Sequence, residues 1–235
     1  MEGRVPPVCF LDPDGDIVRH LRRDADTVRS STWACYHTEL YEITHEELRL
    51  GIVGHAVGGP FAVLVAEELF ASGCALLVSM TSAGQLAEDL ELPCVMLIEH
   101  ALRGDGASQR YLPPEPMVSA DPIALAAATR GLAMAKLTTM RGMVWTTDAP
   151  FRETPSSLAS ARAAGALAVE MEAAALYAFS QAREKPVICF AHVTNQMAQV
   201  DGDFEKGPAD GAEQALAVMI AAAKGWLASR QEAST

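Results

Sequence analysis

The 235-residue sequence predicts an α/β protein whose sheet is substantially parallel. Two observations carry this prediction. Short, continuously apolar runs, which are typical of strands buried on both faces, recur along the chain. Segments with apolar residues at helical spacing lie between them, and strands that alternate with helices in this way build a parallel sheet. No Pro/Gly/Ser-rich linker divides the chain, so we expect residues 1–235 to form one domain.

In the first half of the chain, apolar and aromatic content predicts strands at residues 8–11, 33–41, 48–53 and 74–80. The acidic stretch 12–16 (DPDGD) is a turn, which we expect to be solvated because it lacks the further ligands of a calcium loop. A glycine-rich turn at 54–60 leads into a helix at 61–70. Thr81 and Ser82 follow the fourth strand, at the strand end where open α/β sheets bind ligands.

In the second half, apolar runs predict strands at residues 94–99, 140–147, 166–169 and 186–193. Helical spacing predicts helices at residues 121–136, 156–164, 173–179 and 209–227. Asp121 followed by Pro122 is a typical helix start, because the carboxylate caps free N–H groups and proline fits the first turn.

The stretch 166–177 (ALAVEMEAAALY) places two acids at the junction of a short strand and an alanine-rich helix. In extended backbone, residues two apart share a face, so Glu170 and Glu172 would point together into a site. The alternative is a first helical turn in which both acids complement the positive end of the helix dipole. The sequence pattern alone leaves both interpretations open.

The composition excludes several classes of function. A net charge of −12 without a basic stripe argues against a nucleic-acid partner and favours a small-molecule ligand. Charges interrupt the apolar stretches before the roughly 20 residues that a bilayer requires, and the N-terminus lacks a signal-peptide pattern. Five cysteines without a CxxC pair are typical of reduced thiols, so we expect a cytoplasmic protein. The six histidines show no paired ligand spacing, so we expect no metal.

Five stretches, taken in their order along the chain, resemble the nucleoside phosphorylase and nucleosidase superfamily. They are residues 54–69 (GHAVGGPFAVLVAEEL), 79–86 (SMTSAGQL), 103–114 (RGDGASQRYLPP), 147–153 (TDAPFRE) and 169–179 (VEMEAAALYAF). The resemblance implies a three-layer α/β/α sandwich around a central mixed, largely parallel sheet. It also implies a homo-oligomer (dimer, trimer or hexamer) that cleaves the N-glycosidic bond of nucleosides, without a cofactor and with phosphate or water as the nucleophile.

The resemblance also implies roles for individual residues. Glu172 would bind the ribose hydroxyls, Met171 would pack on the apolar face of the sugar, and Glu170 would flank the pocket near the base. Phe151 would stack on the base. Asn195 stands where purine enzymes often carry an aspartate; its amide can hydrogen-bond a base but cannot act as a general acid, which favours 6-oxopurines. The alternative for Asn195 is an ordinary turn residue.

The phosphate side departs from the family pattern. Val78 stands where phosphorylases carry an arginine, and a valine cannot bind phosphate. Thr81, Ser82 and the backbone near Gly58 can still cradle an anion, and Arg29 is loosely similar to an arginine that reaches the phosphate of a neighbouring subunit. We therefore rank phosphorolysis of a purine nucleoside first, a phosphate-independent nucleosidase second, and a non-catalytic nucleoside-binding protein third.

Overall fold

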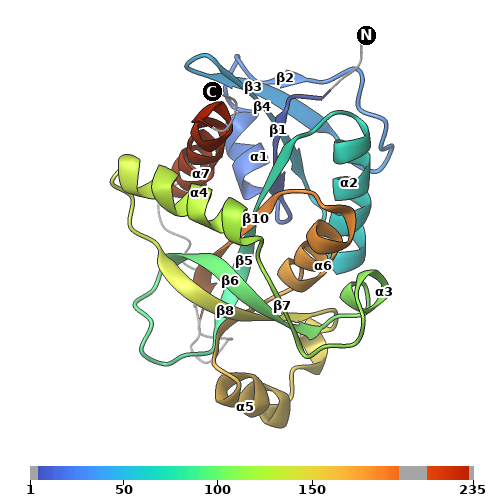
Figure 1. Ribbon diagram of the computed structural model, residues 1–235, viewed down its shortest axis with the longest axis vertical. Helices are drawn as coiled ribbons and strands as arrows, with labels where there is room; N and C mark the ends of the chain where they lie inside the picture. The colour runs from blue at the N-terminus through green and yellow to red at the C-terminus, as the bar shows by residue number, and fades with distance from the viewer. Residues whose placement is uncertain (1–4, 196–210, 233–235) are drawn as a thin grey trace.

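The computed structural model describes residues 5–195 and 211–232, and a single sheet runs through this part of the chain (Figure 1). Its strands are β1 (Val8–Asp12), β2 (Val28–Arg29), β3 (Leu40–His45), β4 (Leu48–Gly54), β5 (Leu76–Gln85), β6 (Cys94–Gly104), β7 (Met117–Ser119), β8 (Met140–Thr147), β9 (Ala166–Glu170) and β10 (Val187–Asn195). They are arranged in the order β10-β6-β8-β9-β5-β1-β4-β3-β2, and β7 pairs with β6. No described helix is long and apolar enough to cross a membrane.

The sheet is mixed, as predicted. Parallel pairing joins β1 to β4 and β5, β5 to β10, and β8 to β6 and β9. Antiparallel pairing joins β3 to β2 and β4, β6 to β7 and β10, and β5 to β9. Because β10 pairs with β5 as well as β6, the strands β10, β6, β8, β9 and β5 form a closed circuit. Strand β5 therefore lies at the centre of the fold.

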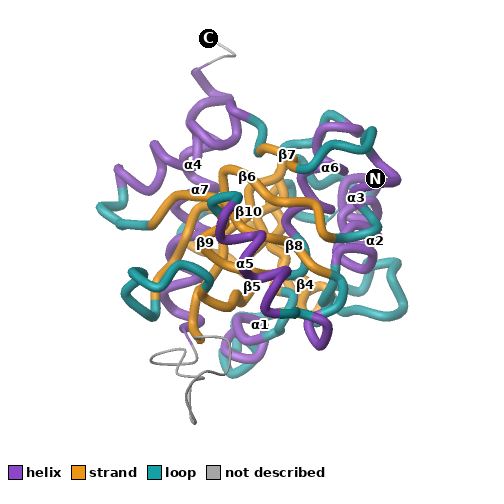
Figure 2. The backbone as a smooth tube through the Cα atoms, turned by 90° about the horizontal axis from the view of Figure 1, so that it is seen from below, coloured by secondary structure: helices purple, strands orange, loops and turns teal. Residues whose placement is uncertain are grey.

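Helices cover both faces of the sheet, as predicted for a three-layer protein (Figures 1 and 2). The helices are α1 (Asp16–Leu21), α2 (Gly59–Ala71), α3 (Ser108–Tyr111), α4 (Pro122–Met134), α5 (Pro155–Ala163), α6 (Ala173–Arg183) and α7 (Ala212–Glu232), with a short 3₁₀ turn, η1 (Pro150–Arg152). Helices α2 and α3 pack against α6, whereas α4 and α1 pack against α7. Helix α5 packs against β9.

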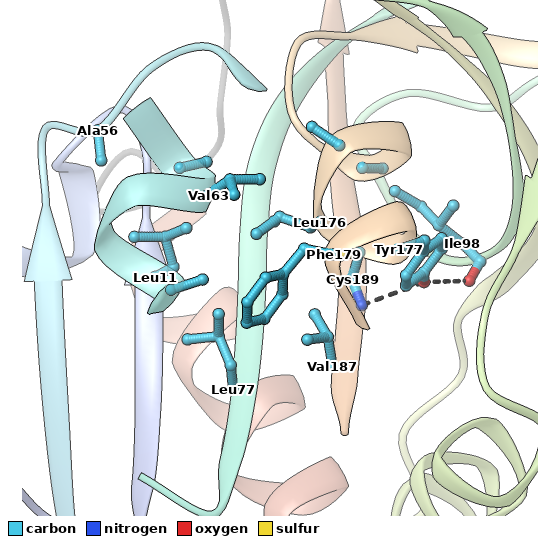
Figure 3. Close-up of a cluster of buried hydrophobic side chains, with 14 of the residues drawn as sticks. Leu11, Ala56, Val63, Leu77, Ile98, Leu176, Tyr177, Phe179, Val187 and Cys189 are labelled. Atoms are coloured by element: carbon cyan, nitrogen blue, oxygen red, sulfur yellow. Dashed lines mark hydrogen bonds between the residues drawn. The ribbon is translucent and has the colours of Figure 1, made fainter. Parts of the chain in front are cut away.

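A buried tyrosine ties α6 to the sheet (Figure 3). The hydroxyl of Tyr177 donates to the carbonyl of Ile98 on β6 at 2.6 Å and accepts from the N–H of Cys189 on β10 at 3.2 Å. Phe179, on the same helix, is fully buried in the surrounding apolar cluster. A fully buried hydroxyl with both a donor and an acceptor partner is stable in an apolar core. The N-terminal end of α6, where Glu172 lies, therefore has a fixed position over the sheet.

Most predicted elements are present, and three predicted strands differ from the structure. Strand β6 ends at Gly104 rather than at residue 99. Residues 33–39 form no strand: Trp33 packs half-buried against the core, and Tyr36 is 89% exposed. The strand predicted to stop at residue 80 continues to Gln85, because residues 81–84 extend the ladder with β10. All five cysteines are free thiols, and all except Cys94 are buried.

Candidate active site

The two acids of the central motif lie on either side of a bend between β9 and α6. Glu170 is the last residue of β9, and Glu172 is the residue that precedes the first turn of α6. Their exposed fractions are 3% and 2%. Met171, between them, is half-buried. Neither acid lies inside the helix. The alternative interpretation, a first helical turn enriched in acids, is therefore wrong.

The carboxylate of Glu172 is held by two segments from distant parts of the chain. One oxygen accepts the N–H of Gly58 at 2.6 Å, and the other accepts the hydroxyl of Thr81 at 2.5 Å. Gly58 precedes α2 and has a φ of +93°, a conformation that side chains rarely adopt. A Cβ on Gly59 would lie 2.8 Å from the Cβ of Ala175, so the start of α2 approaches α6 closely. The positive ends of two helices therefore meet at this carboxylate.

The carboxylate of Glu170 binds the neighbouring strand β8 and the start of α6. Its carboxylate accepts the hydroxyl of Thr146, the N–H of Glu172 at 2.7 Å and the N–H of Ala173 at 2.8 Å. Thr146 in turn accepts the N–H of Ala174 at 2.9 Å. These contacts place Glu170 behind the bend, in a position that supports the backbone of the motif.

Both acids are poor anions in this environment. Burial raises the pKa of Glu170 to about 7. Burial, followed by the negative charge of Glu170, raises the pKa of Glu172 to about 8, against the opposing effect of its two hydrogen bonds. The charge of Asp14 acts in the same direction on Glu172, so Asp14 lies within electrostatic reach of it. The pair resists carrying two charges at neutral pH.

The acidic turn after β1 is part of this site, which the sequence analysis missed. Asp12 is 2% exposed and accepts the N–H of Val18 at 2.9 Å, so the expectation of a solvated turn is wrong. Burial raises the pKa of Asp12 to about 7. The carboxylate of Asp14 accepts the N–H of Ser82 at 3.0 Å. The adjacent residues Thr81 and Ser82 thus bind Glu172 on one side and Asp14 on the other.

A small cavity lies between this turn and the carboxyl end of β5. Its walls are formed by Asp12, Asp14, Asp16, Ile17, Met80, Thr81, Ser82, His192, Gly211, Ala212 and Ala215. None of these described residues is an arginine or a lysine. Arg19, the nearest basic residue along the chain, pairs with Asp16 at 2.6 Å. His192, which lines the cavity, is 5% exposed and is a second residue that the sequence analysis missed.

The remaining predicted residues are spread more widely. Val78 is fully buried in the apolar core. Phe151 lies in η1 with its side chain fully exposed. Arg29 lies on β2, pairs with Glu39 at 3.1 Å and lines a different cavity. Asn195 is the last residue of β10, and its side chain lies outside the part of the chain that the structure describes.

Residues 5–195 and 211–232 contain no candidate metal-binding cluster. Histidine, cysteine, aspartate and glutamate side chains do not gather there into any group of three that could hold a metal ion. The acids after β1 instead bind backbone N–H groups.

The conserved pattern of the family covers nearly the whole chain, since the sequence model of the phosphorylase superfamily matches residues 8–224. The chain belongs to the phosphorylase superfamily. The predicted resemblance to nucleoside phosphorylases and nucleosidases is therefore confirmed. Among curated proteins, none matches this superfamily member in sequence.

Solved structures share the fold. The crystal structure of purine nucleoside phosphorylase from Toxoplasma gondii, in complex with immucillin-H, superposes with a TM-score of 0.81. The match covers 98% of this chain and 94% of that one, at 17% sequence identity. At this identity the likeness establishes the three-layer fold and leaves the reaction of this superfamily member to be argued from its own residues.

Proposed function

We propose that the protein cleaves the N-glycosidic bond of a nucleoside and that water, rather than phosphate, is the nucleophile. The observation that carries the proposal is the contact between Asp14 and the N–H of Ser82. The carboxylate of Asp14 accepts the N–H of Ser82, so this N–H is not available to a phosphate ion. The sequence prediction ranked phosphorolysis first, and this contact favours its alternative, the nucleosidase.

Glu172 is suited to the sugar half of the reaction. Because the pair resists carrying two charges, Glu172 is ionised when Glu170 holds the proton. In that state its carboxylate offers about four lone-pair positions, so Glu172 can keep Gly58 and Thr81 and still accept two ribose hydroxyls. As the bond to the base breaks, the sugar becomes positively charged, and a buried carboxylate stabilises that charge strongly in a low-dielectric site. Met171, half-buried beside Glu172, can pack on the apolar face of the sugar.

The nucleophile half is suited to water. A phosphate dianion would meet the carboxylate of Asp14, and neither the described lining of the cavity nor the buried Val78 offers it an arginine or a lysine. Water carries no charge and is oriented by carboxylates. A carboxylate at the position of Asp14 can also accept the proton that the attacking water loses. We therefore assign Asp14 to the nucleophile side of the site.

For the leaving base we propose a 6-oxopurine. The support is the residue type at the end of β10, where the backbone of Asn195 pairs with Gly84 of β5 in the strand register. An amide can share a hydrogen bond with a purine ring without transferring a proton.

The test is a panel of inosine, guanosine, adenosine and uridine in phosphate-free buffer, with base release followed by chromatography. We expect free base and free pentose, most rapidly from inosine or guanosine. Fastest turnover of uridine would contradict the purine assignment. No release from any nucleoside, with and without added phosphate, would overturn the proposal in favour of the non-catalytic nucleoside-binding protein.

A further inference from the structure

Thr146 and Glu170 lie side by side beneath the ribose-binding motif. The parallel register of β8 and β9 sets Thr146 opposite Glu170, and their exposed fractions are 0% and 3%. Their side chains are hydrogen-bonded to each other. Burying a carboxylate is unfavourable unless hydrogen bonds compensate for the lost water. The buried position of Glu170 therefore suggests that its hydrogen bonds have a function.

The two side chains together satisfy the N-terminal end of α6. The first N–H groups of a helix have no partner within it, and the residue at the N-cap position usually provides one from its own side chain. Here the N-cap residue, Glu172, makes no such bond. Glu170 instead accepts the N–H groups of Glu172 and Ala173, and Thr146 accepts the N–H of Ala174.

Because Glu170 and Thr146 accept the N–H groups at the start of α6, the side chain of Glu172 does not have to cap its own helix. Its carboxylate is therefore available to Gly58 and Thr81, and under the proposed function the ribose hydroxyls bind the same carboxylate. The same contacts fix the backbone of the bend, since Glu170 holds the N–H of Glu172 itself at 2.7 Å. A carboxylate that must meet two hydroxyls needs this positional accuracy, because small displacements cost large factors in rate.

We infer that Thr146 and Glu170 are positioning residues that hold Glu172 in the geometry required to bind the ribose hydroxyls. The inference rests on the proposed function and deepens it. It differs from the sequence prediction for Glu170, which placed this residue at the pocket near the base. Thr146 has no role in that prediction.

The decisive comparison uses a ribonucleoside and its 2′-deoxy analogue as substrates. Thr146→Val removes the hydroxyl at nearly constant side-chain volume. The N–H of Ala174 then loses its acceptor, and the carboxylate of Glu170 loses one of its donors. We expect kcat/KM to fall at least about 10-fold for the ribonucleoside and less than about 3-fold for the 2′-deoxynucleoside, because only the former makes the full contact with Glu172. Thr146→Ser, which restores the hydroxyl, should return both values to within about 3-fold of wild type.

Thr147→Val is the matched control. It removes a buried hydroxyl from the next position of β8, where the partner is the N–H of Ala149. We expect it to leave the ratio of the two kcat/KM values unchanged. If Thr146→Val does not fold, Glu170→Gln gives the same readout, since its amide cannot accept from all three donors. Equal losses for both substrates in the folded variant, or no loss, would overturn the inference.

Glu172→Gln separates this inference from the proposed function. If this variant keeps the wild-type preference for the ribonucleoside, Glu172 does not bind the ribose hydroxyls and the role given to it in the proposed function fails. If it loses the preference while Thr146→Val and Glu170→Gln keep it, the ribose site stands and the positioning role alone is wrong.

Discussion

The two halves of the candidate site are built in opposite ways. The sugar half consists of one continuous motif, residues 170–172, whose contacts to Gly58 and Thr81 are short and mutually consistent. The nucleophile half is assembled from the turn after β1, the end of β5 and the neighbourhood of α7. Long-range contacts hold both halves, since Asp14 and Ser82 are 68 positions apart and Glu172 lies 114 positions from Gly58 and 91 from Thr81. The halves differ in that the functional side chains of the nucleophile half do not come from one motif.

The difference between the two halves is one between backbone geometry and individual side chains. The position of the Glu172 carboxylate depends on the geometry of a strand, a bend and a helix start. The nucleophile pocket depends on individual side chains of a short turn. Under the proposed function, a carboxylate in place of positive charge there favours water over phosphate while the fold stays the same. Each of the following predictions tests one side of this contrast.

The largest effect is expected on the sugar side. Glu172→Ala should lower kcat/KM by about 1,000-fold, because the charge that stabilises the cationic sugar is removed. The far-ultraviolet circular dichroism spectrum should stay unchanged, since a buried charge that costs desolvation is lost as well. Glu88→Ala, at an exposed position, is the control. Activity within 10-fold of wild type would remove Glu172 from the site.

The next effect is expected on the nucleophile side. In Asp14→Asn the amide oxygen can still accept the N–H of Ser82, so the geometry is kept while the basic oxygen is lost. We expect kcat to fall about 100-fold with little change in KM, the size of a lost general base. Asp26→Asn makes the same charge change at an exposed position and should match wild type. An unaltered kcat would show that Asp14 takes no part in the attack.

A smaller effect is expected where the sugar side depends on backbone geometry. Gly58→Ala meets no neighbouring atom, but it places a side chain at a φ of +93°. We expect about 1–3 kcal/mol of lost unfolding free energy in urea titrations and about a 10-fold lower kcat/KM, because the N–H that holds Glu172 moves. Gly106→Ala, at a residue without a positive φ, should lose less than about 0.5 kcal/mol. Equal losses in the two variants would contradict the account.

The smallest effect concerns pH. The folded protein raises the pKa of Asp12, Glu170 and Glu172 to between about 7 and about 8, so it binds their protons more tightly than the unfolded chain does. The resulting stabilisation is complete below about pH 4 and is lost as the pH rises through 7 to 8. Urea unfolding between pH 5.5 and 8.5 should show falling stability, with a shallower slope in Glu172→Gln. Identical slopes would contradict the burial of an ionisable pair.

The sequence predicted the fold well because its information is local. The strand β8 is present at the predicted bounds, and Asp121 caps α4 through the N–H of Ala124 at 2.7 Å. The motif around Glu172 was also accessible, because its residues are neighbours in the chain. Residues 33–39 were predicted wrongly because aromatic content does not distinguish a strand from an exposed loop.

The nucleophile half could not be predicted for a physical reason. A short acidic turn is solvated unless other elements bury it, and Asp12 and Asp14 are covered by elements far away in the sequence. The pairing of Thr146 with Glu170 depends likewise on strand register, which no local pattern encodes. The signal that was available is the position of the acids directly after β1, at the strand end where α/β proteins bind ligands.

The most direct test of the central claim is a phosphate titration of turnover with the best nucleoside of the panel, with the pentose product identified by mass spectrometry. The account predicts that kcat/KM changes less than about 2-fold between no phosphate and saturating phosphate, and that the product is free pentose. Turnover that requires phosphate and yields pentose 1-phosphate would contradict it, and would show that the carboxylates after β1 do not exclude an anionic nucleophile.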